Sequence, residues 1–195
     1  MATYQIMFTS SGSLEVADDV APWYICSAPY GLTMLGVDLA VKTPCAGASI
    51  ITDIEKSTDG TTWNSIFDSP FIYGTHDGPN NAATLTDASA SFSDDWVGLT
   101  IDNNSDHSMG LISAVNSPTN LSVTLTGGTD NDWDTGNTYT IAVAGGILPG
   151  EYIGAGGTPT VTELEQGNLL RLDVEQCGTS GNPGVDLTVS LRVRQ

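Results

Sequence analysis

A chain of 195 residues is long enough for one large β domain or two small ones, and its 39% hydrophobic content is adequate for a core. The formal net charge of −18, with only five Lys plus Arg, argues against nucleic acid and anionic membranes as partners, because both attract clustered cations. Glycine is abundant at 22 residues, and no segment repeats apolar residues at helical spacing. The composition therefore predicts an all-β protein.

The first part of the chain predicts a series of short strands. The segments with extended or alternating patterns are residues 1–9, 23–26, 37–41, 49–55, 63–67 and 71–73. Asp59-Gly60 between two of them is the dipeptide signal of a tight hairpin turn.

The composition changes at His76. From His76 to Ala144 there is no Lys, Arg or Glu, but there are nine Asp. Strand candidates within this stretch are residues 96–101, 110–115, 121–125 and 138–143. Gly and Pro near residues 78–81 and 144–146 mark two hinges, and insertion into a surface loop has a small entropic cost. We therefore predict a small β domain inserted at residues 76–145.

The last thirty residues show the clearest alternation. Leu170, Leu172 and Val174 alternate with polar residues, and residues 185–193 continue the pattern after a Gly- and Pro-rich turn at 178–184. The pattern predicts a hairpin with one buried face, which we expect to pack against residues 37–41 and 50–54. Residues 1–75 and 146–195 are thus predicted to form one discontinuous antiparallel β-sandwich.

Several segments outside the insert resemble the jelly-roll modules of structural proteins of tailed bacteriophages. They are GVDLAVKT (36–43), PCAGA (44–48), IITDI (50–54), DGTTWNSIF (59–67) and GNLLRLDVEQCG (167–178). The insert is similar to a small β module common in phage and bacterial surface proteins. The matching segments are ATLTDASASF (83–92), VG (97–98), LTGGTDNDW (125–133) and GNTY (136–139).

These resemblances imply a jelly-roll-like fold and a non-enzymatic structural role in a phage particle, as a capsid decoration protein or head fibre. The implied partners are other virion proteins, above all the major capsid protein, and the implied assembly is a homotrimer located in the virion. Two alternatives remain open: a receptor-binding tail or baseplate module that recognises host-surface glycan, and a cellular surface or adhesin domain.

No sequence motif indicates catalysis. There is no nucleophile elbow, phosphate loop or dinucleotide fingerprint, and His76 and His107 lie in polar, turn-like segments expected to be solvated. The sequence shows no signal peptide or membrane span, so we expect folding in the host cytoplasm. The three cysteines are irregularly spaced, which favours free thiols over disulfides or zinc; they are Cys26, Cys45 and Cys177.

One acidic segment is a candidate metal site. Asp130, Asp132 and Asp134 alternate before Gly136 and offer the oxygen ligands that Ca²⁺ prefers. The glycine is one place later than in an EF-hand, and the closing Glu is missing, so an Asx-rich turn is the alternative. No other cofactor is implied.

Two further surfaces are predicted. Packing is the expected role of Trp23, Trp63 and Trp96, whereas Trp133 lies among acids, where an exposed indole would suit contact with a glycan. A last hypothesis concerns the sandwich: Arg171, Arg192 and Arg194 are three of the five cationic residues, and a shared outward face would form the attachment side.

Overall fold

The protein is all-β, with sixteen strands and one short 3-10 helix among the residues that the structure describes. The computed structural model describes residues 2–179 and 181–195, and the side chains of residues 17–23 lie outside that description. The packing expected for Trp23 and the part of the predicted turn at Ser180 therefore lie outside the described residues.

The chain divides into two compact units. The sandwich unit comprises Met1–Pro70 and Ala144–Gln195, and the inserted unit comprises Phe71–Val143. The first boundary lies before the expected position at His76, because residues 71–75 form a strand that pairs with residues 138–142 inside the inserted unit. The change in composition at His76 shows where cationic residues disappear, but it does not reveal the strand that precedes it.

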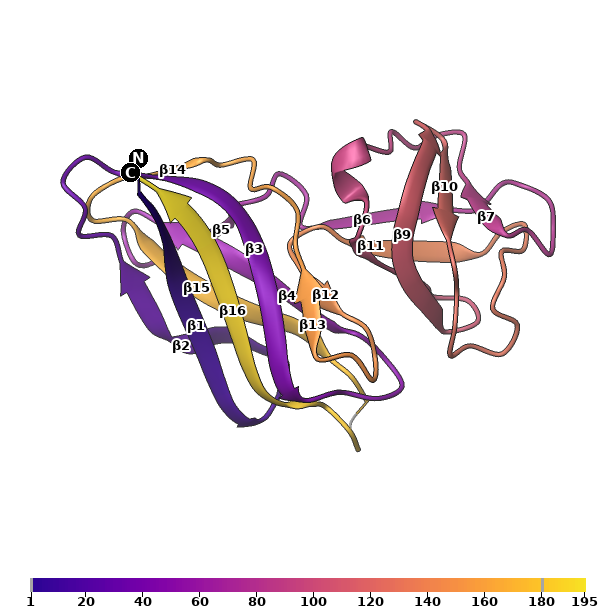
Figure 1. Cartoon of the computed structure of the whole chain (residues 1–195), viewed down its shortest axis with the longest axis horizontal. Helices are drawn as coiled ribbons and strands as arrows, with labels where there is room; N and C mark the ends of the chain where they lie inside the picture. Colours follow the sequence, from indigo (N-terminus) through magenta and orange to yellow (C-terminus); the bar gives the residue numbers. More distant parts are fainter. Residues whose placement is uncertain (1, 180) are drawn as a thin grey trace. The chain divides into compact units, whose positions relative to one another are not determined.

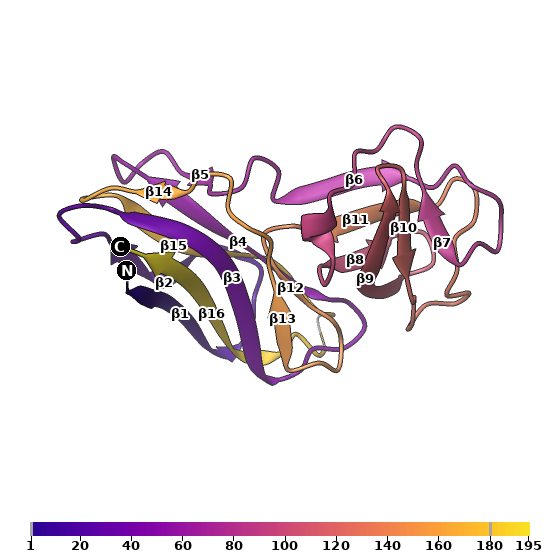
Figure 2. The same ribbon diagram turned by 45° about the horizontal axis from the view of Figure 1, so that its top comes forward.

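The sandwich unit contains a curled, antiparallel, ten-stranded sheet (Figure 1). Its strands are β1 (Thr3–Ser13), β2 (Ala17–Ile25), β3 (Leu32–Thr43), β4 (Ile50–Ser57), β5 (Asn64–Ser65), β12 (Gly146–Ile147), β13 (Ile153–Ala155), β14 (Glu163–Leu164), β15 (Leu169–Cys177) and β16 (Val185–Arg194). The order along the sheet is β1-β16-β3-β13-β12-β4-β15-β2, with β14 beside β3 and β5 beside β4. Figures 1 and 2 show β1, β16 and β3 in one layer and β4, β15 and β2 in the other. The jelly-roll-like sandwich is thus confirmed.

Apolar residues at alternating positions of the strands form the core of this unit. The residues that alternate in the sequence face inward between the two layers and are almost fully buried: Val37, Leu39, Val41, Leu170, Leu172, Val174, Leu187, Val189, Leu191 and Val193. A period of two places every second side chain on one sheet face, so the two layers bury one apolar face each. The prediction for this face is confirmed, although Val185 at its end is only partly buried.

The predicted terminal hairpin is wrong. β15 pairs with β4 and β2, whereas β16 pairs with β1 and β3, so the two strands belong to opposite layers. The connection between them crosses the sandwich and bonds instead to the loop after β3: Gly178 N donates to Ser49 O, and Ala46 N donates to Asn182 O. The apolar faces of β15 and β16 are each buried, but on opposite sides of the core.

The inserted unit is a six-stranded antiparallel sheet in the order β6-β11-β8-β9-β10-β7. Its elements are β6 (Phe71–Thr75), β7 (Thr84–Thr86), the 3-10 helix η1 (Asp94–Trp96), β8 (Thr100–Asn103), β9 (Ser108–Ser117), β10 (Asn120–Val123) and β11 (Thr138–Ala142). The strand expected at residues 96–101 begins only at Thr100, because Ser93 caps η1 by accepting from Asp95 N. A separate core, with Trp133, Tyr139 and Phe92 as its largest side chains, fills this unit.

Among the described residues, no helix is long and apolar enough to span a membrane. The thiols are free, as expected: Cys26 and Cys45 are buried, and Cys177 is partly exposed.

Candidate functional site

The three acidic residues singled out in the sequence lie together in the loop between β10 and β11. One carboxylate oxygen from each of Asp130, Asp132 and Asp134 lies within 4.8 Å of the others. Three carboxylates offer hard oxygen ligands, although Ca²⁺ takes about six to eight oxygens, so water or backbone carbonyls would have to complete its shell. Calcium binding stays a prediction.

Hydrogen bonds from outside the cluster shape this acidic loop. Asp106 Oδ2 accepts from the backbone N–H groups of Asp130 and Asn131, at 3.3 and 2.9 Å. Buried Asn103 donates from Nδ2 to Asp132 O at 3.0 Å, and Asp134 Oδ1 accepts from Asn81 N at 2.9 Å. The loop is therefore held by residues far away in sequence, and no sequence pattern indicated that Asp106 anchors it.

The acidic loop concentrates negative charge. Partial burial, together with the charges of Asp130, Asp134 and Asp106, raises the pKa of Asp132 above its usual value. Four carboxylates repel one another here, and a bound cation would relieve that repulsion.

The exposed indole expected at position 133 is wrong. Trp133 is 0% exposed, and its ring packs edge-on against Tyr139 at 6.3 Å between centroids and beside His76 at 6.0 Å. Backbone bonds in both directions between Trp133 and Ala82 turn the side chain into the core. The indole is therefore unavailable for stacking on a sugar, and the glycan hypothesis loses its aromatic contact.

The solvated histidine expected at position 76 is also wrong, whereas His107 is exposed. His76 is 0% exposed: its Nδ1 accepts from Thr86 N at 3.0 Å, and its Nε2 lies 3.2 Å from Pro79 O. Both ring nitrogens are bonded to backbone groups, so the imidazole locks two loops together and has no free nitrogen for acid–base chemistry.

Tyr139 and Asp87 form a buried polar pair in the same unit as His76. Tyr139 donates its hydroxyl to Asp87 Oδ2 at 2.9 Å. Burial alone would raise the pKa of Asp87, but hydrogen bonds from Ser89, Tyr139 and Thr75 outweigh it and lower the pKa. Burial and this bond raise the pKa of Tyr139. The pair keeps an ionised acid inside the fold and serves structure.

The shared cationic face expected for Arg171, Arg192 and Arg194 is wrong. Arg171 lies on β15, in the layer opposite β16; it pairs with Glu55, and its guanidinium carbon lies 4.7 Å from the centre of the Trp63 ring. Arg192 and Arg194 lie on β16, where Arg192 pairs with Asp38 at 2.9 Å. Only the two β16 arginines share a face, since both alternate with buried residues.

The sequence patterns did not predict one feature of the sandwich unit, a pair of buried carboxyl groups. Asp53 on β4 and Asp173 on β15 stand directly opposite each other, 4% and 6% exposed. Ser65 donates to Asp53 Oδ1 at 2.9 Å. Burial, with smaller contributions from Glu55 and Asp173, raises the pKa of Asp53 to about 7. Polar positions in an alternating strand predict an exposed face, but both carboxyls are nearly buried.

Comparison with known proteins identifies no family for this chain. No family model matches the chain, and no curated protein matches it. Among solved structures it is similar to the VP16-VP17 complex, a complex of the two major capsid proteins of bacteriophage P23-77, with 11% identity, 99% of this chain and 98% of that chain covered, and a TM-score of 0.18. It is also similar to VP17, a capsid protein of bacteriophage P23-77, with 13% identity, coverage of 98% and 95%, and a TM-score of 0.19. Scores this low place the chain in no family.

Proposed function

We propose that the protein is a non-enzymatic structural component of a tailed-phage particle, a capsid decoration protein or head fibre. The sandwich unit attaches to the shell through the major capsid protein, and the inserted unit is carried as an acidic module. The virion is then its site of action. The phage assignment rests on the sequence resemblances described above and on the jelly-roll-like sandwich.

The segregation of cationic residues between the two units carries this proposal. All five Lys and Arg residues lie in the sandwich unit, whereas the inserted unit has nine Asp and no cationic residue. A module of one sign of charge repels its own copies and favours solvent, whereas a mixed surface can contact a protein. The two units therefore suit two roles, attachment and exposure.

A non-enzymatic role is supported by the state of the polar groups inside the fold. His76, Asp87 and Asp53 are buried groups that resemble acid–base machinery, and each is engaged with the backbone or with a neighbouring side chain, Asp53 with Ser65. Groups held in this way stabilise a fold, whereas a general acid or base needs a free position toward a substrate.

The outward face of β16 is the proposed attachment side. Arg194 is exposed and Arg192 is half-exposed beside Asp38, so both can reach a partner surface. Rim charges of this kind set association rate and salt dependence.

Quantitative mass spectrometry of purified particles tests the location. A decoration protein is expected in many copies, comparable with the major capsid protein. A few copies per particle would indicate the tail instead, and absence from the particle would overturn the proposal.

Co-sedimentation with empty shells tests the attachment side. Arg194→Glu is expected to weaken binding and reduce its salt dependence, whereas Lys56→Glu, on the other layer, is the matched control and is expected to bind normally. Equal binding of both variants would contradict attachment through β16. The homotrimer implied by the resemblance and a dimer are alternative assemblies, and the mass of the protein in solution decides between them.

A further inference from the structure

β1 is the end strand of the ten-stranded sheet. It pairs with β16 along one side, from Thr3 opposite Arg194 to Ser13 opposite Val185, and the sheet path ends there. A register shift between Ser10 and Ser13 disturbs only the last part of the pairing. Over residues 3–9 the strand is regular, and β16 is the neighbour that Figure 1 shows alongside it. Its outer backbone groups therefore form a regular edge.

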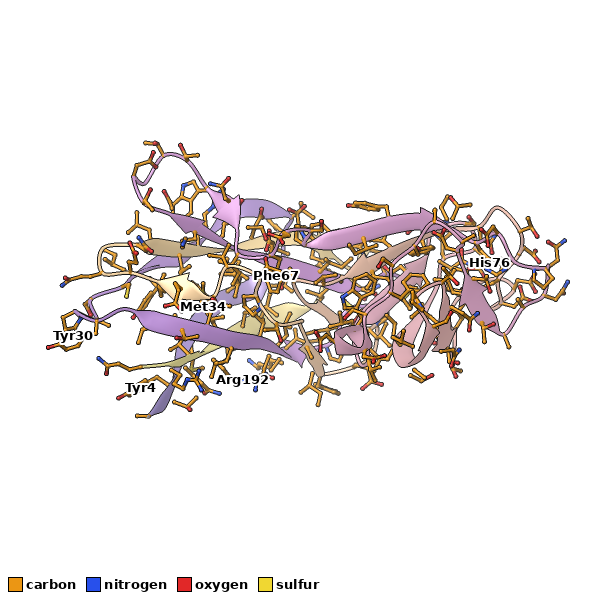
Figure 3. The ribbon with its side chains drawn as sticks, turned by 90° about the horizontal axis from the view of Figure 1, so that it is seen from above. Tyr4, Tyr30, Met34, Phe67, His76 and Arg192 are labelled. Carbon is orange, nitrogen blue, oxygen red and sulfur yellow. The ribbon has the colours of Figure 1, made fainter. Side chains whose placement is uncertain are left out.

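Over residues 3–9 this edge lacks the usual protection against pairing. Natural edge strands are kept apart by charged residues, prolines, bulges or short length. β1 has 11 residues, and none of them is charged or proline. Two large side chains are exposed along it, Tyr4 at 49% and Met7 at 59%. Figure 3 shows Tyr4 at the same margin of the sandwich unit as Arg192, whose strand pairs with β1.

The charge of the layer that contains β1 differs from that of the chain. β1, β16 and β3 together carry three cations and two acids, whereas the chain carries a net charge of −18. Both acids are paired, Asp186 with Lys42 at 3.0 Å and Asp38 with Arg192 at 2.9 Å. Like-charge repulsion toward a second copy of this acidic chain is therefore weaker along these three strands than along the rest of the chain.

We propose that β1 pairs antiparallel with β1 of a second copy, about a two-fold axis, so that the two ten-stranded sheets become continuous. A two-fold axis perpendicular to the sheet pairs odd-numbered with odd-numbered residues, and the buried side of one sheet then continues into the buried side of the other. The same uncharged edge serves both copies, as an isologous contact requires. Regular backbone over residues 3–9 supplies the hydrogen bonds, and Met7, on the outer face, lies beside the outward side chains of the other copy.

Native mass spectrometry and light scattering of the full chain test this pairing over a wide range of concentration. A dimer is expected. Met7→Lys places a charge on the edge without touching the core, and we expect it to raise the dissociation constant at least about tenfold. Tyr30→Lys adds the same charge at a residue that is 89% exposed outside the strands, and it should leave the dimer unchanged. Equal melting temperatures would show that both variants fold.

A monomer at every concentration would overturn the proposal, as would a dimer that Met7→Lys does not weaken. A trimer would overturn it too, because an isologous edge closes at two copies. Hydrogen exchange of the unmodified protein gives an independent measurement: amides of residues 3–9 should exchange more slowly at high than at low concentration. Exchange independent of concentration in this segment contradicts the pairing.

Discussion

Asp53 and Asp173 show how burial changes the chemistry of two polar residues in a sheet. Both carboxyls are nearly buried and face each other on neighbouring strands. Ionising two carboxylates in such a place is unfavourable, because burial penalises charge and like charges repel.

The Asp53 carboxyl makes stability depend on pH. Its pKa in the folded protein is raised to about 7 from 3.8, so its contribution is fully present below pH 3.8 and is lost as the pH rises through 7. Asp53→Asn keeps an acceptor for Ser65 but does not ionise. We expect the variant to gain stability relative to the unmodified protein between pH 5 and 8, by at most about 4 kcal/mol.

Denaturant unfolding at several pH values measures this difference. Ser65→Ala is the matched control: it removes the hydrogen bond that favours the ionised form, so its loss of stability should be largest at high pH. A difference between Asp53→Asn and the unmodified protein that does not vary with pH would contradict the assignment.

Asp132 lies where the acidic loop concentrates charge, so removing one carboxylate has two expected effects. In calcium-free buffer, Asp132→Asn should raise the melting temperature, because it relieves repulsion from Asp130, Asp134 and Asp106. In calcium, the unmodified protein should gain more than the variant, if the cation binds as predicted. Asp95→Asn, an acid outside the cluster, is the control. A melting temperature unchanged by both EDTA and Ca²⁺ would contradict calcium binding by the acidic loop.

At the level of elements, the connection between β15 and β16 decides the topology. Each strand has the alternation of a half-buried strand, and the pattern is the same whether the next strand lies beside it or across the core. The difference lies in the connection: Asn182 N donates to Thr179 O in a local turn, but this turn bonds to Ala46 in the loop after β3 and does not join β15 to β16 as neighbours.

Gly178 is the residue of this connection most sensitive to substitution. Its φ is +75°, and an added Cβ would lie 2.6 Å from Asn182 O and 2.7 Å from Cys45 Cβ. We expect Gly178→Ala to destabilise the protein by about 1–3 kcal/mol through strain and the displaced neighbours. Gly181→Ala, with nothing within 4 Å and no unusual φ, should be nearly neutral in the same thermal unfolding experiment.

Sequence reasoning succeeded where periodicity alone decides the outcome, as in the buried residues of β3, β15 and β16. It failed where a residue's surroundings come from elsewhere in the chain. Polar neighbours suggested that Trp133 and His76 are exposed, but pairing with Ala82 and bonds from Thr86 draw both inward. The cluster of Asp130, Asp132 and Asp134 was visible because its members are adjacent in sequence; Asp106, which anchors it, was not.

At the scale of the whole molecule, each unit brings its own chain ends together. Ala144 N donates to Pro70 O at 3.0 Å, and Phe71 stands opposite Ala142 in the inserted sheet. We expect a chain lacking residues 71–143, joined by a short Gly-Ser linker, to fold as the sandwich unit, and residues 71–143 to fold alone. Circular dichroism and thermal melting check this, and a fragment without a cooperative transition would contradict it.

The same layout has a consequence during synthesis. β1 and β3 are joined only through β16, among the last residues made, whereas every strand of the inserted sheet lies within residues 71–142. At ~5–20 residues per second the ribosome takes roughly 10–40 s to reach β16 after β1. The inserted unit can therefore fold first on the nascent chain, while the uncharged β1 stays unpaired until β16 has been made. Ribosome-bound chains stalled before Val185 should accordingly recruit chaperones through the first strands.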